Sequence, residues 1–240
     1  LCIISTLSKN RFNITNKIYS KFKVKNFIVE KIVEQNTDGL NNFLKLSKKI
    51  NIFVSFPLRC SKFYNSLKLK KIKKFKLKVI SNVNDLASNG IHFLDLSTWL
   101  TSKKIKRIDT NKISSWFPAK RQGYKEFYGK IKIYFNNGGL LSLENNTHAK
   151  GKFEIFLDKN EYLINDYNEK IYINKNKIYK SNSVSISKIM KFEINKIFKN
   201  KKSKLPLFQD IYENHYLYIK YLLNNYNKIK KTKLKSLPIT

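Results

Sequence analysis

The stretch Asn26–Lys31, NFIVEK, is a short apolar run that ends in a carboxylate and an ammonium group. Two further apolar runs, Leu1–Thr6 and Asn51–Pro57, are also predicted strands. Segments with helical periodicity alternate with the strands: Lys9–Phe22, a helix capped by Thr37 or Asp38 and running to Ile50, and a basic helix over Cys60–Phe75. Strands that alternate with helices at this spacing predict a parallel sheet. Continuous apolar strands indicate that both faces of this sheet are covered. Residues 1–74 are therefore expected to form an α/β unit.

The pattern changes after residue 75. A strand over Lys76–Val83 and a helix over Asp85–Thr101 precede many short β-type runs between residues 105 and 180, separated by Asn- and Gly-rich turns. Runs of this kind are typical of an antiparallel meander, and two further helices, Val184–Lys199 and Leu207–Tyr226, close the chain. We therefore predict an α+β domain over residues 75–240, with an open, mostly antiparallel sheet and helices on one face.

The chain is strongly basic: 49 Lys and Arg against 16 Asp and Glu give a formal net charge of +33. Such an excess can serve nucleic-acid binding, because cations neutralise phosphates. Only four of the 49 are arginines: Arg11, Arg59, Arg107 and Arg121. Lys, Asn and Ile share A/T-rich codons, and Ala occurs only three times, so a low-GC genome explains much of the lysine excess. Nucleic-acid binding stays the weaker alternative, and no specific nucleic-acid partner is predicted.

The sequence gives little support to several other classes of protein. No apolar run approaches the ~18 residues that cross a bilayer, so no membrane partner is expected. Cys2 and Cys60 cannot build a disulfide framework or a zinc site by themselves, and no metal is predicted. We expect a cytoplasmic protein with reduced cysteines. The sequence contains no Gly-x-Gly-x-x-Gly, no Walker motif and no Gly-x-Ser-x-Gly elbow.

Three side chains could carry chemistry. Lys31 follows a predicted parallel strand, and the carboxyl ends of such strands face the crevice where α/β sheets bind ligands. An ammonium group there can stabilise a developing alkoxide, although a surface lysine is the simpler alternative in this chain. His92 lies near the start of a predicted helix and could exchange a proton near neutral pH, or be a half-buried histidine partnered by Asp95. Arg59 follows the third strand and could hold an anionic or polyhydroxyl ligand, or form an ion pair.

The stretches around Lys31, Arg59 and His92, in this order along the chain, resemble the glucose–fructose oxidoreductase / inositol dehydrogenase / MocA family. Ile3–Arg11 resembles the strand and loop that line the family's nicotinamide site, and Phe27–Ile32 resembles its "VxxEKP" strand. Gly90–Asp95 resembles the "DxGxHxxD" helix start, whose His corresponds to His92. The last segments, Leu205–His215 and Ser236–Ile239, resemble the family's closing helix and tail.

This resemblance implies an NAD- or NADP-dependent oxidoreductase that acts on a hydroxyl/carbonyl pair of a sugar or nucleotide sugar, as in surface-polysaccharide synthesis. Residues 1–74 would be the C-terminal part of a Rossmann-like dinucleotide-binding domain, and residues 75–240 would form the substrate domain, whose open sheet could mediate homo-oligomers. The resemblance implies that Lys31 and His92 are the catalytic residues. It also implies that the cofactor is contacted by Thr6, Ser8, Glu30 and Lys31, and the substrate by Arg59 and Asn89.

The chain also departs from the family pattern. Ser88 stands where "DxGxH" has its first Asp, Ile32 replaces the Pro after Lys, and Arg11 replaces the loop His. The family's Gly-rich phosphate loop would precede Leu1, so we expect the sequence to be the C-terminal part of a longer protein. Ser88 and the missing phosphate loop favour a second hypothesis, a relative without catalysis that binds a sugar or a partner protein.

Overall fold

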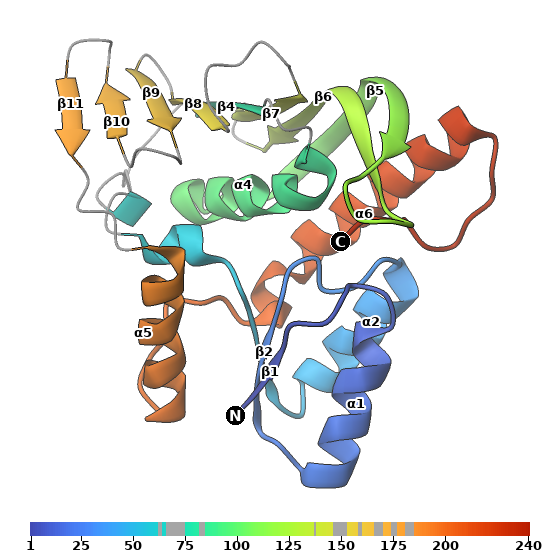
Figure 1. The fold of residues 1–240 in the computed structure, drawn as a ribbon, viewed down its shortest axis with the longest axis vertical. Coiled ribbons are helices and arrows are strands. Elements are labelled where there is room, and N and C mark those ends of the chain that lie inside the picture. Colours follow the sequence, from blue (N-terminus) through green and yellow to red (C-terminus); the bar gives the residue numbers. More distant parts are fainter. Residues whose placement is uncertain are drawn as a thin grey trace.

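The computed structural model contains two β-sheets with helices packed between and around them (Figure 1). It describes residues 1–61, 64–65, 75–81, 85–136, 138–145 and 185–240, together with the backbones of strands at 153–157, 160–165, 170–173 and 177–180. Helices α4 (Leu86–Thr101) and α6 (Phe208–Lys230) lie between the large sheet and the small α/β unit. The fold therefore combines a partial parallel sheet with a larger mixed sheet, as predicted.

The small sheet contains β1 (Cys2–Ile4), β2 (Asn26–Val29) and β3 (Asn51–Val54), all parallel and in the order β1-β2-β3. Helices α1 (Arg11–Phe22) and α2 (Thr37–Ser47) connect the strands. The strands are shorter than predicted: β1 and β2 end before Ser5, Thr6 and Glu30, which line a pocket, and β3 ends at Val54. Phe27 and Val29 are fully buried, as strands covered on both faces require.

Side chains stabilise the first turns of both helices in this unit. The Asn36 side chain caps α2 by accepting a 2.6 Å hydrogen bond from Gly39 N, so the expected caps Thr37 and Asp38 were wrong. The first turn of α1 contains no acidic residue. Glu34 supplies the carboxylate from another loop, at 3.1 Å from Phe12 N.

After β3 the chain forms a short 3₁₀ helix, η1 (Pro57–Cys60). The basic helix predicted over Cys60–Phe75 falls mostly outside the described residues, although Tyr64 and Asn65 are helical. The predicted domain boundary at 74/75 also adjoins residues outside the described part.

The large sheet has the order β11-β10-β9-β8-β4-β7-β6-β5 among the strands that the structure describes. Their bounds are β4 Lys76–Ser81, β5 Ile105–Pro118, β6 Lys125–Phe135, β7 Leu140–Asn145, β8 Phe153–Leu157, β9 Asn160–Asn165, β10 Lys170–Ile173 and β11 Lys177–Lys180. All neighbours are antiparallel except β4 and β7, which pair in parallel. The meander is therefore interrupted: β4 inserts between β7 and β8, where the buried Leu77 and Val79 occupy the centre of the sheet.

Helix α6 joins the two units into one apolar core. Its first residue, Phe208, packs on Phe43 of α2 with ring centroids 5.8 Å apart. Further along α6, Asn225 accepts a 2.9 Å hydrogen bond from the indole of Trp116 on β5. Helix α5 (Ile186–Phe198) packs beside η1. Because the small and large sheets share this core, the space between them is held by packing on both sides.

Gly90 allows the closest approach in this core. A Cβ at this position would lie 2.4 Å from the Tyr218 hydroxyl oxygen on α6 and 2.7 Å from Leu143 on β7. The Tyr218 hydroxyl donates to the carbonyl oxygen of Leu86 at 2.7 Å, which fixes α6 against the first turn of α4. A side chain at position 90 would therefore push α4 away from both neighbours.

Gly90→Ala is expected to lower the free energy of unfolding by about 1–3 kcal/mol, the usual cost of overpacking a core. Chemical denaturation measures this loss. Tyr218→Phe removes the closest clashing atom, so the Gly90→Ala/Tyr218→Phe pair should lose less stability than the sum of the single variants. Strictly additive losses would show that the methyl group does not meet Tyr218.

Candidate functional site

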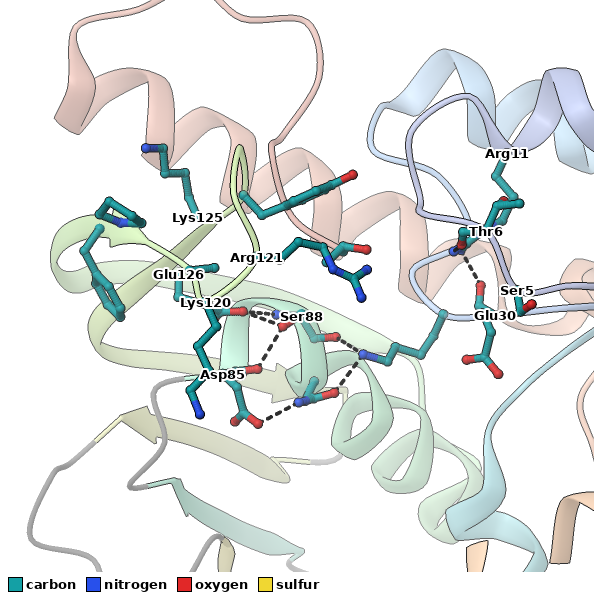
Figure 2. A pocket seen from close by; sticks show the side chains of 17 residues that line it. Ser5, Thr6, Arg11, Glu30, Asp85, Ser88, Lys120, Arg121, Lys125 and Glu126 are labelled. Atoms are coloured by element: carbon teal, nitrogen blue, oxygen red, sulfur yellow. Dashed lines mark hydrogen bonds between the residues drawn. The ribbon is translucent and has the colours of Figure 1, made fainter. Parts of the chain in front are cut away.

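A pocket with a volume of about 820 Å³ opens where the two units meet (Figure 2). The carboxyl ends of β1 and β2 form one wall, the first turn of α4 forms the floor, and the hairpin between β5 and β6 forms the opposite wall. Its lining residues are Ser5, Thr6, Arg11, Glu30, Lys31, Asp85, Ser88, Asn89, Phe117, Pro118, Ala119, Lys120, Arg121, Tyr124, Lys125, Glu126 and Thr240. Strand carboxyl ends are the usual ligand edge of an α/β sheet.

Lys31 crosses the interface between the two units. Its Nζ donates to the Ser88 carbonyl oxygen at 3.1 Å and to Asn89 Oδ1 at 2.7 Å. Burial lowers the pKa of Lys31 below its ordinary value of 10.5, and the nearby carboxylates, led by Glu30, oppose this shift. The peptide bond between Lys31 and Ile32 is cis. The ammonium group is therefore held between β2 and α4 on the pocket wall.

Asp85 orients the amide that binds Lys31. Its Oδ2 accepts a 2.8 Å hydrogen bond from Asn89 Nδ2, and its Oδ1 accepts a 3.0 Å hydrogen bond from the Ser81 hydroxyl. With its NH₂ group turned to Asp85, Asn89 presents its oxygen to the ammonium group. Lys31, Asn89 and Asp85 thus form one connected polar chain along the first turn of α4.

Glu126 on β6 reaches the same turn from behind. Its carboxylate accepts hydrogen bonds from Ala87 N at 2.7 Å, from Ser88 N at 3.3 Å, and from the Ser88 hydroxyl. Burial raises the pKa of Glu126 from 4.5 to about 7, against the effect of these hydrogen bonds. Strand periodicity carries no sign of this role, so Glu126 was missed from the sequence.

Arg11 ties together the two loops that form the strand-end wall. Its buried guanidinium donates to the carbonyl oxygens of Thr6, Glu30 and Ile32. Burial lowers the pKa of Arg11 to about 10, and Glu30 and Glu34 oppose this shift. The residue that replaces the family's loop His thus fixes the backbone under the pocket.

Four of the residues predicted for the site line this one pocket: Thr6, Glu30, Lys31 and Asn89. Ser8 does not, because its buried hydroxyl donates to the Ile239 carbonyl oxygen at 2.6 Å and accepts from Gln35. Arg59 also lies away from the pocket wall. Its Nε donates to Asp95 Oδ2 at 2.6 Å, and a second hydrogen bond makes the pair bidentate. The structure thus places Ser8 and Arg59 in structural contacts.

His92 lies one turn further along α4, on the same helix face as Ser88 and Asn89. Its ring packs edge-on against Phe56, with centroids 5.3 Å apart. The local Asp95 partner considered above is instead bound to Arg59. His92 is absent from the pocket wall, although Lys31 contacts the residues three and four positions before it. The helix that carries His92 therefore meets Lys31, and a direct role for His92 stays a prediction.

Arg121 is a second residue that the sequence analysis did not single out. It lies at the tip of the hairpin between β5 and β6, and its side chain extends from the tip into the pocket (Figure 2). The other three arginines have structural contacts: Arg11 and Arg59 as above, and Arg107 over the Tyr134 ring at 4.5 Å. The scarcity of arginine in this chain was the available signal.

Neither a metal site nor a membrane-spanning helix is found in the part of the chain that the structure describes. Within these ranges, no three His, Cys, Asp or Glu side chains gather as a metal site would need. No described helix combines the length and apolarity that crossing a bilayer takes.

Solved structures share this architecture. UDP-N-acetylglucosamine 3-dehydrogenase GnnA from Acidithiobacillus ferrooxidans has a TM-score of 0.65 at 12% identity, covering 95% of this chain and 78% of that one. An oxidoreductase from Agrobacterium radiobacter, solved with NAD+, L-tartaric acid and magnesium, has a TM-score of 0.63 at 12% identity, covering 90% and 75%. The chain has the fold of these oxidoreductases.

The same fold also occurs in Gal80p, which is a transcriptional regulator in Kluyveromyces lactis. The Saccharomyces cerevisiae protein has a TM-score of 0.66 at 12% identity, covering 97% of this chain and 78% of that one. No protein-family model and no curated protein matches the chain. The resemblance drawn from the short motifs is confirmed as a likeness of fold.

The pair Arg59–Asp95 should be a structural element of this fold. Asp95 is 1% exposed and Arg59 13%, so Arg59→Met leaves a buried carboxylate unpaired and should lower the free energy of unfolding by about 3–5 kcal/mol. The pair Arg59→Met/Asp95→Leu should recover most of that loss, as measured by denaturant unfolding. A double variant as unstable as Arg59→Met would contradict this assignment.

Proposed function

We propose that this chain forms the substrate pocket of an NAD- or NADP-dependent oxidoreductase that interconverts a hydroxyl and a carbonyl on a sugar or nucleotide sugar. The supporting observation is the position of Lys31, an ammonium group on the pocket wall at the carboxyl end of β2, held by the first turn of α4. The likeness to GnnA supports the nucleotide-sugar class.

Lys31 can bind the reacting oxygen directly. An ammonium group has three N–H donors, and the contacts with Ser88 and Asn89 use two among the described residues. The third is available to an oxygen in the pocket, where its charge stabilises the alkoxide that develops as the hydroxyl is oxidised. Partial burial strengthens this interaction, since the Lys31 ammonium group is less exposed to water than that of a surface lysine.

His92 is proposed as the group that takes the hydroxyl proton. It lies on the same face of α4 as Ser88 and Asn89, one turn beyond them. His92 does not line the pocket wall, so this role requires the substrate hydroxyl to come within hydrogen-bond reach of the imidazole, beyond the first turn of α4. General acid–base catalysis of this kind typically contributes ~10²–10⁴-fold to turnover.

The strand-end wall fits the nicotinamide end of a dinucleotide. Ser5 and Thr6 line the pocket at the end of β1, and Glu30 lines it at the end of β2. Arg11 holds the backbone between them. A bound nicotinamide would accept or supply the hydride, and Ser5, Thr6 and Glu30 would hold its ring beside Lys31.

The second candidate is a binding protein without catalysis. The likeness to Gal80p, a transcriptional regulator, and the serine at position 88 favour it. The two functions differ in one assay: the oxidoreductase reduces NAD+ or NADP+ in the presence of a sugar nucleotide, and the binding protein does not.

Lys31→Met in the complete protein should lower kcat by about 10²–10³-fold, because it removes one donor to the developing alkoxide. His92→Gln should lower it by about 10²–10⁴-fold. Nicotinamide absorbance with UDP-N-acetylglucosamine and related sugar nucleotides measures both. Lys25→Met, at the other end of β2, is the matched control and should keep wild-type turnover. Full activity in Lys31→Met would refute its role.

Arg121→Ala should raise KM by about tenfold or more for a substrate that carries a diphosphate, with little change in kcat, because a charge-assisted contact contributes to binding. The same change should have little effect on a neutral free sugar. Lys106→Ala, an exposed cation on β5, controls for net charge. Equal effects of Arg121→Ala and Lys106→Ala would show that Arg121 makes no specific contact.

A further inference from the structure

Glu126 is a buried carboxylate for which neither the motifs nor the proposed chemistry accounts. It is 5% exposed, lies on β6, and faces the first turn of α4 at the pocket. Figure 2 shows it opposite Ser88, with dashed lines joining the two residues. A carboxylate in such a place is costly unless hydrogen bonds hold it, so its contacts should indicate what it does.

The contacts of Glu126 are those of a helix cap supplied from another element. The first amides of a helix have no intrahelical acceptor, and the residue before the first turn commonly provides one. In α4 that residue is Asp85, whose side chain makes no cap hydrogen bond and binds Asn89 and Ser81 instead. Glu126 accepts from the amides of Ala87 and Ser88 in its place.

Ser88 connects this cap to Lys31. Its amide and hydroxyl donate to the Glu126 carboxylate, and its carbonyl oxygen accepts from Lys31 Nζ at 3.1 Å. Ser88 is thus bound on one side by the Glu126 carboxylate and on the other by the Lys31 ammonium group. A shift of Ser88 would move the acceptor that holds Lys31, and the neighbouring Asn89 with it.

Several charged or titratable groups surround Glu126. Asp85 directly precedes α4, Lys31 follows β2, Tyr218 comes from α6, and Lys125 precedes Glu126 on β6. Glu126 favours the charged form of Lys31, and Asp85 disfavours the charged form of Glu126. The negative charge of Glu126 therefore supports the charged form of the Lys31 ammonium group, while burial and Asp85 oppose ionisation of Glu126 itself.

We propose that Glu126 is a positioning residue of the site: its ionised carboxylate fixes the first turn of α4 where Ser88 and Asn89 hold the Lys31 ammonium group. The effect on turnover rests on the proposed oxidoreductase function. The effect on α4 does not depend on it.

The pH dependence follows from the same contacts. A protonated carboxyl group accepts fewer hydrogen bonds, so the cap weakens as the pH falls through about 7, the pKa to which burial raises Glu126. The contribution of Glu126 to the free energy of unfolding changes with pH in the opposite direction. Since the pKa in the folded protein lies above the unfolded value of 4.5, the folded state holds the proton more tightly, and stability from this group is lost as the pH rises from about 4.5 to about 7.

The test compares Glu126→Gln with wild type in the complete protein, by amide hydrogen exchange and by turnover. Gln presents an NH₂ group to amide donors, so exchange at Ala87 and Ser88 should accelerate by about tenfold or more at pH 8. With a sugar nucleotide and NAD+ or NADP+, kcat should fall about tenfold, and the acid limb near pH 7 should disappear.

Ser88→Ala is the milder variant. It removes one hydrogen bond to the ionised Glu126 and leaves the backbone contacts, so the acid limb should move to higher pH without loss of the fold. Glu144→Gln is the matched control: this glutamate on β7 pairs with Lys130, and its replacement should leave exchange in α4 unchanged.

The outcomes separate the two proposals. A wild-type protein without turnover, but with faster exchange in Glu126→Gln, would overturn the proposed function and support the positioning role. Turnover in the wild type, with exchange and pH profile unchanged in Glu126→Gln and Ser88→Ala, would overturn the positioning role alone. Faster exchange in Glu144→Gln as well would also overturn it, because the effect would not be specific to Glu126.

Discussion

The contact between the Lys31 ammonium group and the first turn of α4 is the interaction on which the candidate site depends. It joins a strand end of the small sheet to a helix that packs on the large sheet, through Ser88 and Asn89. Each end is held from behind: Arg11 fixes the loops around Lys31, and Glu126 fixes the turn around Ser88. The ammonium group thus remains in a partly buried place because its charge is balanced and its donors are paired.

The surrounding fold makes this contact stiff. Helix α6 packs against both units, and Gly90 allows α4 to approach α6 closely enough for the Tyr218 hydroxyl to bind the Leu86 carbonyl oxygen. A site between two sheets that share one core has little freedom to open by separation of the sheets. Preorganisation of this kind is what electrostatic stabilisation of a developing charge requires, since no reorganisation is then needed during the reaction.

Local patterns were sufficient to predict the alternation of strands and helices and the position of Lys31, since a strand end is a local feature. The roles of residues that depend on partners distant in the sequence could not be predicted from these local patterns. Arg59 follows a strand just as Lys31 does, yet the buried Asp95 takes its guanidinium. Glu126 reaches α4 only because β6 pairs beside β7, and β4 enters the sheet between β7 and β8, which periodicity does not encode. Ser8 likewise binds Ile239, more than two hundred residues away in the sequence.

A crystal structure of the complete protein with NAD+ and UDP-N-acetylglucosamine would test the central claim most directly. The account predicts the sugar in the pocket between β2 and α4, with a hydroxyl oxygen about 3 Å from Lys31 Nζ, while Ser88 and Asn89 retain their contacts with the same ammonium group. A sugar bound outside this pocket, or a Lys31 side chain turned away from α4, would contradict it.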